Sequence, residues 1–432
     1  MIWIYRILFL PIFALSIPYI LWHVKRRGGY KKDLNHKFGH IPDHGETAAG
    51  IKRVWIQAVS VGEVKALKSL IETLSGDTSF EVILTTTTST GYQIAKENYG
   101  EILEGIYYFP LDFVSFSRKA WNRIRPDMCL LMEGELWPEH IHRANKRNVP
   151  IILVNARLSD KTFKLYQRLG AVTRHIFQSL DLVMASSENN GERFQALGVS
   201  KDKIVPVGNL KCDLPIPRKL SEEEKSILTK ELGLPTHSEA PDSIIVCGAS
   251  TWNGEEAILA GICENLRKEG INLHMVITPR HAERRKEIET TLGNFELSTH
   301  FRSRGKVTKD VQISIADTTG ELTKFIQISD IVFVGKSLKP HTGGQTPIEA
   351  AMLGKPVLFG PGMSNFRDIA RSLLNSGIAT QVEDEDALRN VIRELCLDPD
   401  LRIHQGLKVA AWLEANQGAT ERTYQLLKNY RQ

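Results

Sequence analysis

The chain has 432 residues, 42% of them hydrophobic and 24% charged, and a formal net charge of +5. This composition excludes a disordered chain, and the length predicts two domains of about 200 residues each. The five scattered cysteines form no Cys-x-x-Cys pair, which argues against a disulfide framework or a structural zinc site and favours a reducing compartment.

The positive charge is concentrated at the N-terminus. Residues 1–40 carry seven Lys and Arg against one Asp, a net of +6, so residues 41–432 together sum to −1. A basic segment of this kind suits an anionic lipid surface. Because the basic residues are confined to that segment, we expect no nucleic-acid partner.

An apolar run within this segment indicates a membrane anchor. Residues 7–22 carry no formal charge, a length that is short for a membrane span and long for a signal-peptide core. A basic cluster follows in place of a small-residue cleavage site, so we expect an uncleaved anchor helix in a membrane, with the rest of the chain on the cytoplasmic side. Arg6, Pro11 and Pro18 leave open an amphipathic helix that lies in the membrane interface.

From residue 54 onward, short apolar runs typical of buried strands alternate with helical segments. Alternation at this spacing predicts a doubly wound parallel sheet. The strands predicted in the first half are residues 54–59, 82–86, 128–132, 151–154, 182–185 and 204–207, and helices between them include 63–74 and 91–98.

A proline-containing stretch interrupts this alternation before a second α/β half begins. A capped helix is predicted inside it at 221–232, and further strands follow at 244–248, 273–278, 331–334 and 356–359. Two such Rossmann-like sheets would place their ligand sites at the carboxyl ends of the strands, facing a cleft. The predicted organisation is an anchor and basic segment at 1–40, domains at 41–212 and 243–400 joined by a linker at 213–242, and a helical segment at 401–432.

Glu63 follows the first predicted strand, three residues after Ser60. In one interpretation the pair is a capping box, in which Glu63 only satisfies an N–H group of its own helix. In the other, Glu63 is a carboxylate at the strand end that points into the cleft as a general base, kept ionised by the helix dipole. The local pattern leaves both open.

Two further strand ends in the first half carry ionisable groups. Glu133 and Glu135 lie beside Trp137 after a wholly apolar strand, which is an unusual ending for a purely structural loop. Arg157 ends the next strand, and Lys211 follows the last one. A lysine there can hold a phosphate or a developing negative charge, although most lysines are simply solvated.

A glycine loop leads into a helix in the second half. Gly343 and Gly344 allow the backbone to approach a ligand closely, and Pro347 suits the first helical position. A helix that starts after such a loop directs free N–H groups at an anion, typically a phosphate. Thr346 and Glu349 fit a capping box equally well.

Arg280 ends another predicted strand and suits a bidentate phosphate contact. Thr318 and Glu321 form one more potential capping box. A capping role would explain Glu63, Glu321 and Glu349 one by one. It does not explain why all three helix starts also carry a glycine at the end of a strand. We expect no metal site, because residues 139–142 offer too few ligands and the acidic residues 383–386 fit a solvated helix start.

Five motifs stand in a fixed order along the chain. They are Ser-Val-Gly-Glu63, Glu133-Gly-Glu-Leu-Trp-Pro138, Asn-Ala-Arg-Leu-Ser159, Pro-Arg-His281 and Gly-Gly-x-x-Pro-x-Glu349. In this combination, and with an apolar anchor before them, they resemble the 3-deoxy-D-manno-octulosonic acid (Kdo) transferases of lipopolysaccharide synthesis. The likeness extends from the anchor to about residue 369.

The resemblance implies a GT-B glycosyltransferase that uses CMP-Kdo as donor and a lipid A precursor (lipid IVA) as acceptor, without a metal or other cofactor. The domain at 41–212 would bind the acceptor and the domain at 243–400 the nucleotide sugar. By similarity Glu63 is the general base, and Glu133 and Lys211 assist the transition state. The residues that would hold CMP are Pro279, Arg280, Thr319, Gly320, Glu321, Thr346, Pro347, Ile348 and Glu349.

Two places depart from the family's pattern. Gln345 and Thr346 stand where His-Asn is common, and Trp252 stands where a histidine is common. Alternative interpretations are a GT-B transferase or an epimerase that uses a UDP-sugar, and a catalytically inactive membrane-bound scaffold. The presence of Glu63 and Arg280 argues against a scaffold, which needs neither.

Overall fold

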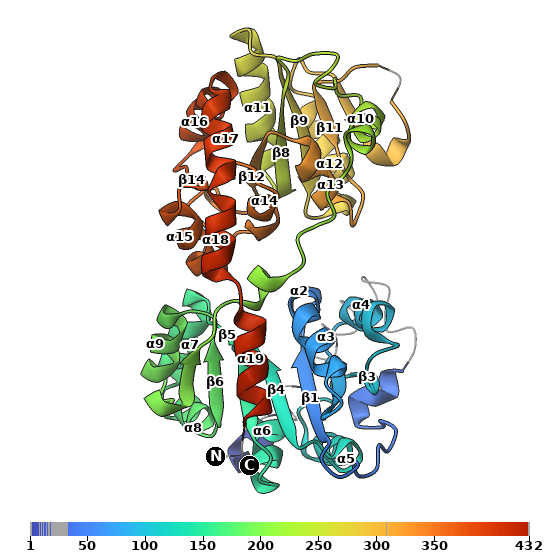
Figure 1. Ribbon diagram of the computed structural model, residues 1–432, viewed down its shortest axis with the longest axis vertical. Coiled ribbons are helices and arrows are strands. Elements are labelled where there is room, and N and C mark those ends of the chain that lie inside the picture. The colour runs from blue at the N-terminus through green and yellow to red at the C-terminus, as the bar shows by residue number, and fades with distance from the viewer. Residues whose placement is uncertain are drawn as a thin grey trace. The chain divides into compact units, whose positions relative to one another are not determined.

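The structure is a computed structural model that describes residues 2–7, residues 9, 11, 13, 15 and 18, and residues 33–307 and 309–430. The chain divides into two compact units. Unit 1 comprises Met1–Leu214 and Asn416–Gln432, and unit 2 comprises Pro215–Ala415. Each unit is built around one 7-stranded sheet (Figure 1), so the two α/β halves expected from the sequence are present.

The sheet of unit 1 is parallel throughout, with the strand order β3-β2-β1-β4-β5-β6-β7. Its strands are β1 (Lys52–Ala58), β2 (Phe80–Thr86), β3 (Gly105–Tyr108), β4 (Met128–Met132), β5 (Ile151–Ala156), β6 (Leu182–Ala185) and β7 (Ile204–Pro206). Ile56 of β1 is in register with Leu84 on one side and Leu130 on the other. The strand order reverses direction between β1 and β4, the switch point where such sheets bind ligands.

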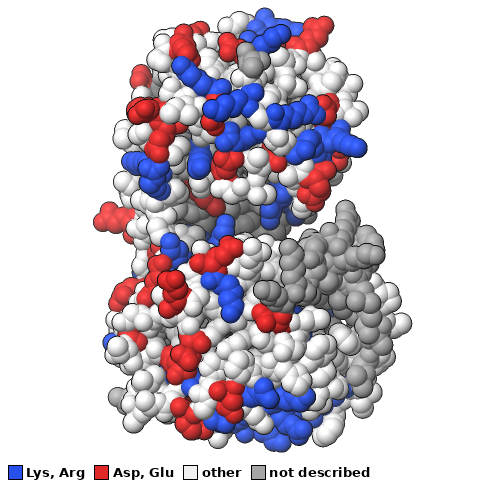
Figure 2. Space-filling view, turned by 90° about the vertical axis from the view of Figure 1, so that its right-hand side faces the viewer, with Lys and Arg blue, Asp and Glu red and all other residues white. Residues whose placement is uncertain are grey.

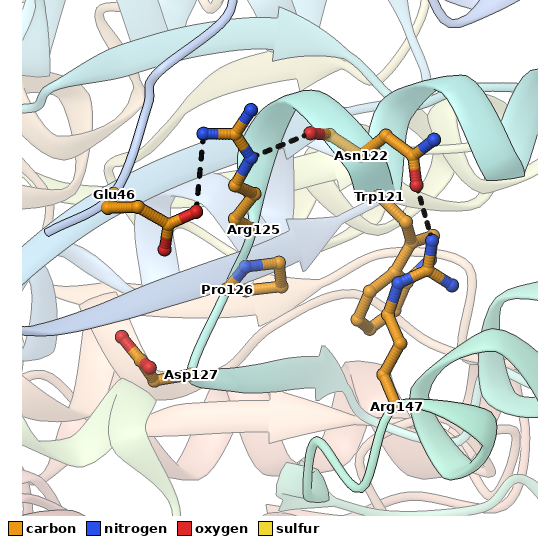
Figure 3. A pocket seen from close by; sticks show the side chains of 7 residues that line it. All are labelled: Glu46, Trp121, Asn122, Arg125, Pro126, Asp127 and Arg147. Carbon is orange, nitrogen blue, oxygen red and sulfur yellow. Dashed lines mark hydrogen bonds and ion pairs between the residues drawn. The ribbon is translucent and has the colours of Figure 1, made fainter.

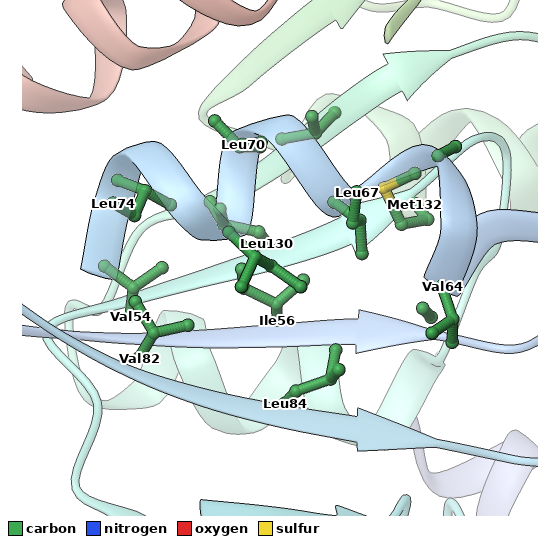
Figure 4. Close-up of a cluster of buried hydrophobic side chains, with 14 of the residues drawn as sticks. Val54, Ile56, Val64, Leu67, Leu70, Leu74, Val82, Leu84, Leu130 and Met132 are labelled. Carbon is green, nitrogen blue, oxygen red and sulfur yellow. The ribbon is translucent and has the colours of Figure 1, made fainter. Parts of the chain in front are cut away.

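Helices cover both faces of this sheet. They are η1 (Leu34–Phe38), α2 (Val61–Ala66), α3 (Lys68–Gly76), α4 (Ser89–Tyr99), α5 (Val114–Ile124), α6 (Pro138–Lys146), α7 (Asp160–Leu169), α8 (Ala171–Gln178), α9 (Glu188–Ala196), η2 (Lys201–Lys203), η3 (Leu210–Asp213) and α19 (Ala419–Lys428). On one face α2, α3, α4 and α19 bury side chains such as Ile56, Leu70 and Leu130 (Figure 4). On the other face α5, α6, α8 and α9 pack around Trp55 and Phe177. Burial of this apolar surface fixes the carboxyl ends of β1 and β4 at one edge.

The sheet of unit 2 is also parallel, with the strand order β10-β11-β9-β8-β12-β13-β14. Its strands are β8 (Ile244–Thr251), β9 (Leu273–Pro279), β10 (Thr299–Phe301), β11 (Ile313–Ile315), β12 (Ile331–Val334), β13 (Val357–Phe359) and β14 (Ala379–Gln381). The switch point of this sheet lies between β8 and β12, where Phe333 is in register with Gly248.

The helices between residues 222 and 416 belong to unit 2, except for Asn416, the last residue of α18, which belongs to unit 1. They are α10 (Glu222–Glu231), α11 (Glu255–Lys268), η4 (Ala282–Arg284), α12 (Arg285–Leu292), η5 (Arg302–Arg304), α13 (Leu322–Ile328), α14 (Ile348–Met352), α15 (Arg367–Asn375), α16 (Glu385–Leu397), α17 (Pro399–Leu407) and α18 (Val409–Asn416). Helices α11, α12 and α16 share one buried apolar cluster with the sheet, which includes Leu259 and Ile392. Figure 2 shows acidic and basic side chains interspersed over one face of unit 2, as on an ordinary solvated surface.

The predicted strands are present, whereas β3, β10, β11 and β14 are absent from the sequence prediction. These four are short, and each contains Gly, Ser, Thr or Gln, so none gives the wholly apolar run that marks the equally short β13. The helix predicted at 63–74 is divided at Leu67 into α2 and α3. The helix predicted at 221–232 is α10, which has the full capping box between Ser221 and Glu224.

The C-terminal helices divide between the two units. The segment predicted to be helical at 401–432 contains most of α17 and all of α18 and α19, and α19 belongs to unit 1, where it lies beside α3 (Figure 1). The stretch 213–242, treated as a linker in the sequence, holds α10, which packs against α13 of unit 2. The chain therefore leaves unit 1 after Leu214 and returns to it at Asn416.

Residues 2–7 are helical, and most of the predicted apolar run 7–22 lies outside the described residues. Among the helices that the structure describes, none is both long and apolar enough to cross a membrane. Arg6 donates to both carboxylate oxygens of Glu139, a wholly buried residue, at 2.8 and 2.9 Å. This bidentate pair attaches the N-terminal helix to unit 1.

Candidate active site

Five ionisable side chains gather at the carboxyl edge of the unit 1 sheet. Glu63 follows β1, Glu133 and Glu135 follow β4, Arg157 follows β5, and Lys211 follows β7. The structure thus brings together the three residues expected to carry the chemistry, Glu63, Glu133 and Lys211, within reach of one another's charge. Because β1 and β4 flank the switch point, this is where an open α/β sheet accepts a ligand.

Glu63 is buried at the start of α2, with Ser60 as the N-cap residue. Ser60 Oγ accepts a hydrogen bond from the Glu63 N–H at 3.3 Å and donates one to the Glu63 carboxylate at 2.9 Å. The same carboxylate accepts the N–H of Val59, the residue before the N-cap, at 2.7 Å, so Ser60 caps the helix but Glu63 does not return the bond to the Ser60 N–H as a full capping box would. Burial, and next the charge of Glu133, raise the pKa of Glu63, against the helix-dipole effect expected from the sequence.

Glu133 is held by two cations. Its carboxylate lies 2.6 Å from Arg157 Nη2 and 3.7 Å from Lys211 Nζ. Its backbone adopts φ +58°, a left-handed conformation that is rare for a residue with a Cβ and is found preferentially at functional sites. With its carboxylate engaged by both cations, Glu133 is suited to orienting Arg157 and Lys211.

Glu135 has the most perturbed carboxyl of the group. Burial, and next the charge of Glu63, raise the pKa of Glu135 to about 8, while a hydrogen bond from Trp137 Nε1 at 3.1 Å acts in the opposite direction. At neutral pH Glu135 is therefore largely protonated and can donate a hydrogen bond.

The raised pKa of Glu135 predicts a pH-dependent stability. Between the ordinary glutamate pKa of 4.5 and about 8 the folded protein keeps a proton that the unfolded chain releases, so stability falls as the pH rises through this window. We expect Glu135→Gln to flatten the decline in the free energy of unfolding between about pH 5 and 8, by up to about 1.4 kcal/mol per pH unit, as measured by denaturant unfolding at several pH values. The exposed Glu101→Gln is the control, and an equal slope in wild type and Glu135→Gln would contradict the assignment.

The residues expected to bind the nucleotide lie along the carboxyl edge of the unit 2 sheet. Pro279 ends β9 and Arg280 follows it, residues 319–321 follow β11, and residues 346–349 follow β12. Arg280 is exposed and forms no ion pair with any described residue. Its N–H donates to the Thr251 carbonyl at 3.0 Å, which fixes the start of its side chain beside the end of β8. A cation held in this way is available to an anion.

The expectation that Glu321 is the third residue of a capped helix is wrong. Helix α13 begins at Leu322, and the N-cap position held by Glu321 makes no side-chain capping bond. The Glu321 carboxylate instead accepts two hydrogen bonds from Arg302 at 2.8 and 2.9 Å, and one from Thr318 Oγ1 at 2.7 Å. A bidentate charged pair is stronger than a bond to one backbone N–H and decides the orientation.

The capping box expected at Glu349 is wrong in register for a similar reason. Helix α14 begins at Ile348, so Glu349 is its second residue and Pro347 precedes the helix instead of opening it. Thr346 Oγ1 accepts the N–H of Ile348 at 3.3 Å. With only five residues, α14 is fixed by the loop before it and by packing more than by its own caps.

Glu255 is a structural residue of this edge that the sequence pattern does not indicate. One carboxylate oxygen accepts the N–H groups of Trp252 at 2.8 Å and Lys336 at 2.7 Å. The other accepts those of Ser337 at 3.0 Å and Leu338 at 3.4 Å. The residue is 1% exposed, and burial raises its pKa. In the sequence it is only one of two adjacent acids at a helix start, a pattern typical of a solvated helix terminus.

The ends of β8 and β12 also touch through glycine. A Cβ on Gly335 would lie 2.5 Å from the Ser250 carbonyl oxygen, so no other residue fits there without movement of the backbone. Gly343 and Gly344 have φ of +105° and +66°, as the glycine loop predicts. These contacts hold the loops after β8 and β12 close together at the switch point of unit 2.

A pocket of about 540 Å³ lies on unit 1 away from these residues. Its lining comprises Glu46, Trp121, Asn122, Arg125, Pro126, Asp127 and Arg147 (Figure 3). Arg125 lies 3.4 Å from Glu46, and Arg147 donates to Asn122 at 2.5 Å, so the lining groups largely satisfy one another. Asp127 precedes β4, which places the pocket at the amino edge of the sheet, opposite Glu63.

One group of potential metal ligands occurs within the described residues. Ligand atoms of His44, Glu81 and Glu104 lie within 4.8 Å of one another. Glu81 is already paired with Arg53 at 2.6 Å, and a ring nitrogen of His44 lies 2.9 Å from the Tyr107 hydroxyl. Glu81 stands near the start of β2 and Glu104 precedes β3, so this group also lies at the amino edge and away from Glu63.

Comparison with known proteins identifies the family. The family model described as 3-deoxy-D-manno-octulosonic-acid transferase (kdotransferase) matches residues 32–214. The 3-deoxy-D-manno-octulosonic acid transferase of Haemophilus influenzae is 32% identical over 380 residues, which are 87% of this chain and 87% of that protein. The chain belongs to the Kdo transferase family. The enzyme of the same name from Chlamydia pneumoniae is 26% identical over 99% of this chain and 95% of its own length.

Solved structures agree on the fold of this Kdo transferase. A co-structure of S. aureus MnaA with UDP has a TM-score of 0.61 at 16% identity and covers 88% of this chain and 97% of its own. A UDP-GlcNAc 2-epimerase from Neisseria meningitidis has a TM-score of 0.58 at 15% identity, with 87% and 100% covered. At this level of identity the likeness concerns the fold alone, which is the pair of Rossmann-like units of a GT-B glycosyltransferase.

Proposed function

We propose that this Kdo transferase takes Kdo from CMP-Kdo and transfers it to the lipid A precursor lipid IVA, with Glu63 as the general base. The observation that carries the proposal is the environment of Glu63, a carboxylate 7% exposed at the switch point of unit 1 whose pKa is raised by burial. A raised pKa brings a carboxylate closer to the pH at which it must accept a proton. Unit 1 would then bind the acceptor and unit 2 the donor.

In the proposed reaction Glu63 takes the proton of an acceptor hydroxyl as that oxygen attacks the anomeric carbon of Kdo. The bond from this carbon to the phosphate oxygen breaks, and its electron pair leaves with CMP. Lys211, oriented by Glu133, and Arg280 would balance the negative charge that develops, so the proposed reaction needs no metal ion. The remaining CMP contacts would come from Pro279, Thr319, Gly320, Glu321, Thr346, Pro347, Ile348 and Glu349.

The overall reaction has a direct test. Incubation of the protein with CMP-Kdo and a tetraacyl lipid A precursor should give, by mass spectrometry, a product heavier by one or more Kdo residues. UDP-sugars are the alternative donor class, because proteins of the same fold were solved with UDP and UDP-GlcNAc. Thermal protection by UDP-sugars and none by CMP would favour that alternative.

Arg280→Ala should weaken CMP binding by about 1.5–3 kcal/mol, the usual contribution of a charge-assisted contact to phosphate. Arg280 has no protein partner to lose among the described residues, so the melting temperature of the free protein should stay unchanged. Isothermal calorimetry with CMP measures the effect, and Lys286→Ala, an exposed lysine on α12, is the control. An unchanged affinity would remove Arg280 from the donor site.

We further propose that the N-terminal helix holds the enzyme on the cytoplasmic face of the inner membrane. Tyr5 donates to buried Asp112 at 2.6 Å, on the side of the helix that faces unit 1. Trp3, Ile4 and Ile7 are 70%, 63% and 71% exposed, so an apolar face is left for lipid. A helix with one attached polar side and one exposed apolar side suits the membrane interface, and the basic residues that follow would favour anionic lipid.

The double variant Ile4→Asp/Ile7→Asp should reduce binding to anionic phospholipid vesicles at least about tenfold, because burial of each isoleucine contributes about 1.5–3 kcal/mol. Cosedimentation with vesicles measures this effect. CMP affinity should not change, since both side chains point away from unit 1. Ile227→Asp, at a residue 54% exposed on α10, is the matched control, and equal vesicle binding by all three proteins would argue against the helix as the membrane contact.

A further inference from the structure

Lys336 lies at the switch point of the unit 2 sheet, two residues after the end of β12. Its Nζ is 4.2 Å from the centroid of the Trp252 ring, which follows β8. The rings of His281 and His341 lie 5.3 and 5.9 Å from the same indole. A cation over an aromatic face is held electrostatically, so this ammonium has a defined position.

No acidic group neutralises this ammonium within the part of the chain that the structure describes. Glu255, which is bonded to the backbone of Lys336, uses its carboxylate for the N–H groups of Trp252, Lys336 and Ser337. The Lys336 side chain is also only partly exposed. A partly desolvated cation without a counter-charge is stabilised when an anion binds to it.

The glycine loop approaches the same ammonium from another side. A Cβ on Gly343 would lie 3.7 Å from Lys336 Nζ and 2.8 Å from Asn365 Nδ2. The N–H of Gly344 donates to the Lys336 carbonyl at 3.1 Å. Lys336 Nζ therefore lies between the indole face and the Gly343 backbone, beside the Asn365 amide, and its side chain remains partly exposed to solvent.

The backbone of Lys336 is unusual in its own right. Its φ of +59° lies in the left-handed region, which favours glycine and is energetically unfavourable for lysine. Backbone conformations of this kind are found preferentially at functional sites. Glycine would fit the same backbone without strain, so a lysine at this position points to a role for its side chain.

We propose that Lys336 binds an oxyanion of the sugar-nucleotide donor, either its phosphate or the carboxylate of its sugar acid, and that Trp252 positions the ammonium. This inference rests on the proposed function, because it takes unit 2 as the donor-binding unit. Lys336 would be a second cation at the same sheet edge as Arg280. Arg280 follows β9 and Lys336 follows β12, which are the two strands on either side of β8. Two cations on either side of one strand end match a donor that carries two negative groups.

Lys336→Gly is the decisive variant, since it removes the ammonium and relieves the left-handed backbone, so the melting temperature should not fall. Calorimetry on the full-length protein would use CMP-Kdo, CMP and cytidine as ligands. We expect CMP-Kdo affinity to fall about 10- to 100-fold while the affinity for uncharged cytidine stays constant. An equal loss with CMP assigns Lys336 to the phosphate, and a loss confined to CMP-Kdo assigns it to the sugar carboxylate.

Three controls separate a binding role from a structural one. Lys339→Ala, at an exposed lysine in the same loop, should leave all affinities unchanged. Trp252→Phe keeps an aromatic face and should retain most of the CMP-Kdo affinity, whereas Trp252→Ala should not. Added NaCl should weaken binding to wild type more than binding to Lys336→Gly.

Two outcomes would count against the proposals, and they differ. Equal affinities of wild type and Lys336→Gly for CMP-Kdo and CMP would overturn the role of Lys336 and leave the proposed function intact. A wild-type protein that bound neither CMP-Kdo nor CMP would overturn the proposed function and this inference with it.

Discussion

Replacing Glu63 by glutamine is expected to lower turnover by ~10²–10⁴-fold, while CMP affinity and melting temperature stay near wild type. Glutamine has nearly the same shape, and its amide oxygen can still accept the Val59 N–H that Glu63 accepts at 2.7 Å. It cannot take a proton from an acceptor hydroxyl. A residue that only caps α2 would tolerate this change, so turnover separates the two interpretations of Glu63 that its sequence leaves open.

Glu349→Gln is the matched comparison for this experiment. It makes the same chemical change at the start of a helix in unit 2, where the proposed partner is the nucleotide. We expect it to weaken CMP binding in calorimetry and to affect the chemical step less than Glu63→Gln does. Near-normal turnover in Glu63→Gln would leave that residue as a helix cap alone.

The three glutamates of the candidate site in unit 1 have environments that separate their roles. Glu133 lies between two cations. Burial raises the pKa of Glu63, and it raises the pKa of Glu135 to about 8. Glu63 can accept a proton only in its ionised form. The acid limb of the pH profile of kcat/KM should therefore report the raised pKa of Glu63, at a higher pH than an ordinary glutamate would give. If Glu63→Gln kept its turnover, Glu135 would be the next residue to test, because Glu133 is engaged by Arg157 and Lys211.

The place of the site follows from the sequence for a physical reason. Alternating apolar strands and helices specify a parallel sheet, and a parallel sheet puts every strand's carboxyl end at one edge. Polar residues directly after such strands, such as Glu63, Glu133 and Arg280, must therefore share an edge within their own unit. The capping pattern at Ser60 was likewise predictable, because it depends only on residues three apart.

Partners distant in sequence could not be predicted in this way. Arg6 and Glu139 are 133 residues apart, Arg157 and Glu133 are 24 apart, and Arg302 and Glu321 are 19 apart. These pairs form only when tertiary packing brings their elements together, and local pattern carries no information about them. The misassigned capping at Glu321 shows the consequence, since a charged partner from another segment outweighed a local N–H group.

Glu255 is the clearest example of a residue whose partners lie far away in the sequence, since Lys336 and Ser337 are 81 and 82 positions from it. Its removal is expected to have the largest effect on stability. Its carboxylate accepts four backbone N–H groups at 2.7–3.4 Å in a site where the residue is 1% exposed. Each buried donor left without a partner costs about 1–3 kcal/mol, and water that enters the vacated space offsets part of this cost. We therefore expect Glu255→Ala to destabilise unit 2 by about 3–5 kcal/mol, which corresponds to a fall in melting temperature of about 6–20 °C.

Calorimetric melting of wild type and variant measures this loss, and Glu269→Ala on the surface of the same unit is the control. Glu269 pairs with Arg393 at 2.9 Å, but both side chains are about half exposed, so its removal should cost less than about 1 kcal/mol. Because Glu255 binds the backbone of both Trp252 and Lys336, its loss should also lower CMP-Kdo affinity by releasing the two loops. Equal melting temperatures for Glu255→Ala and Glu269→Ala would show that the ends of β8 and β12 are held together by packing and by Gly335, without need of the buried carboxylate.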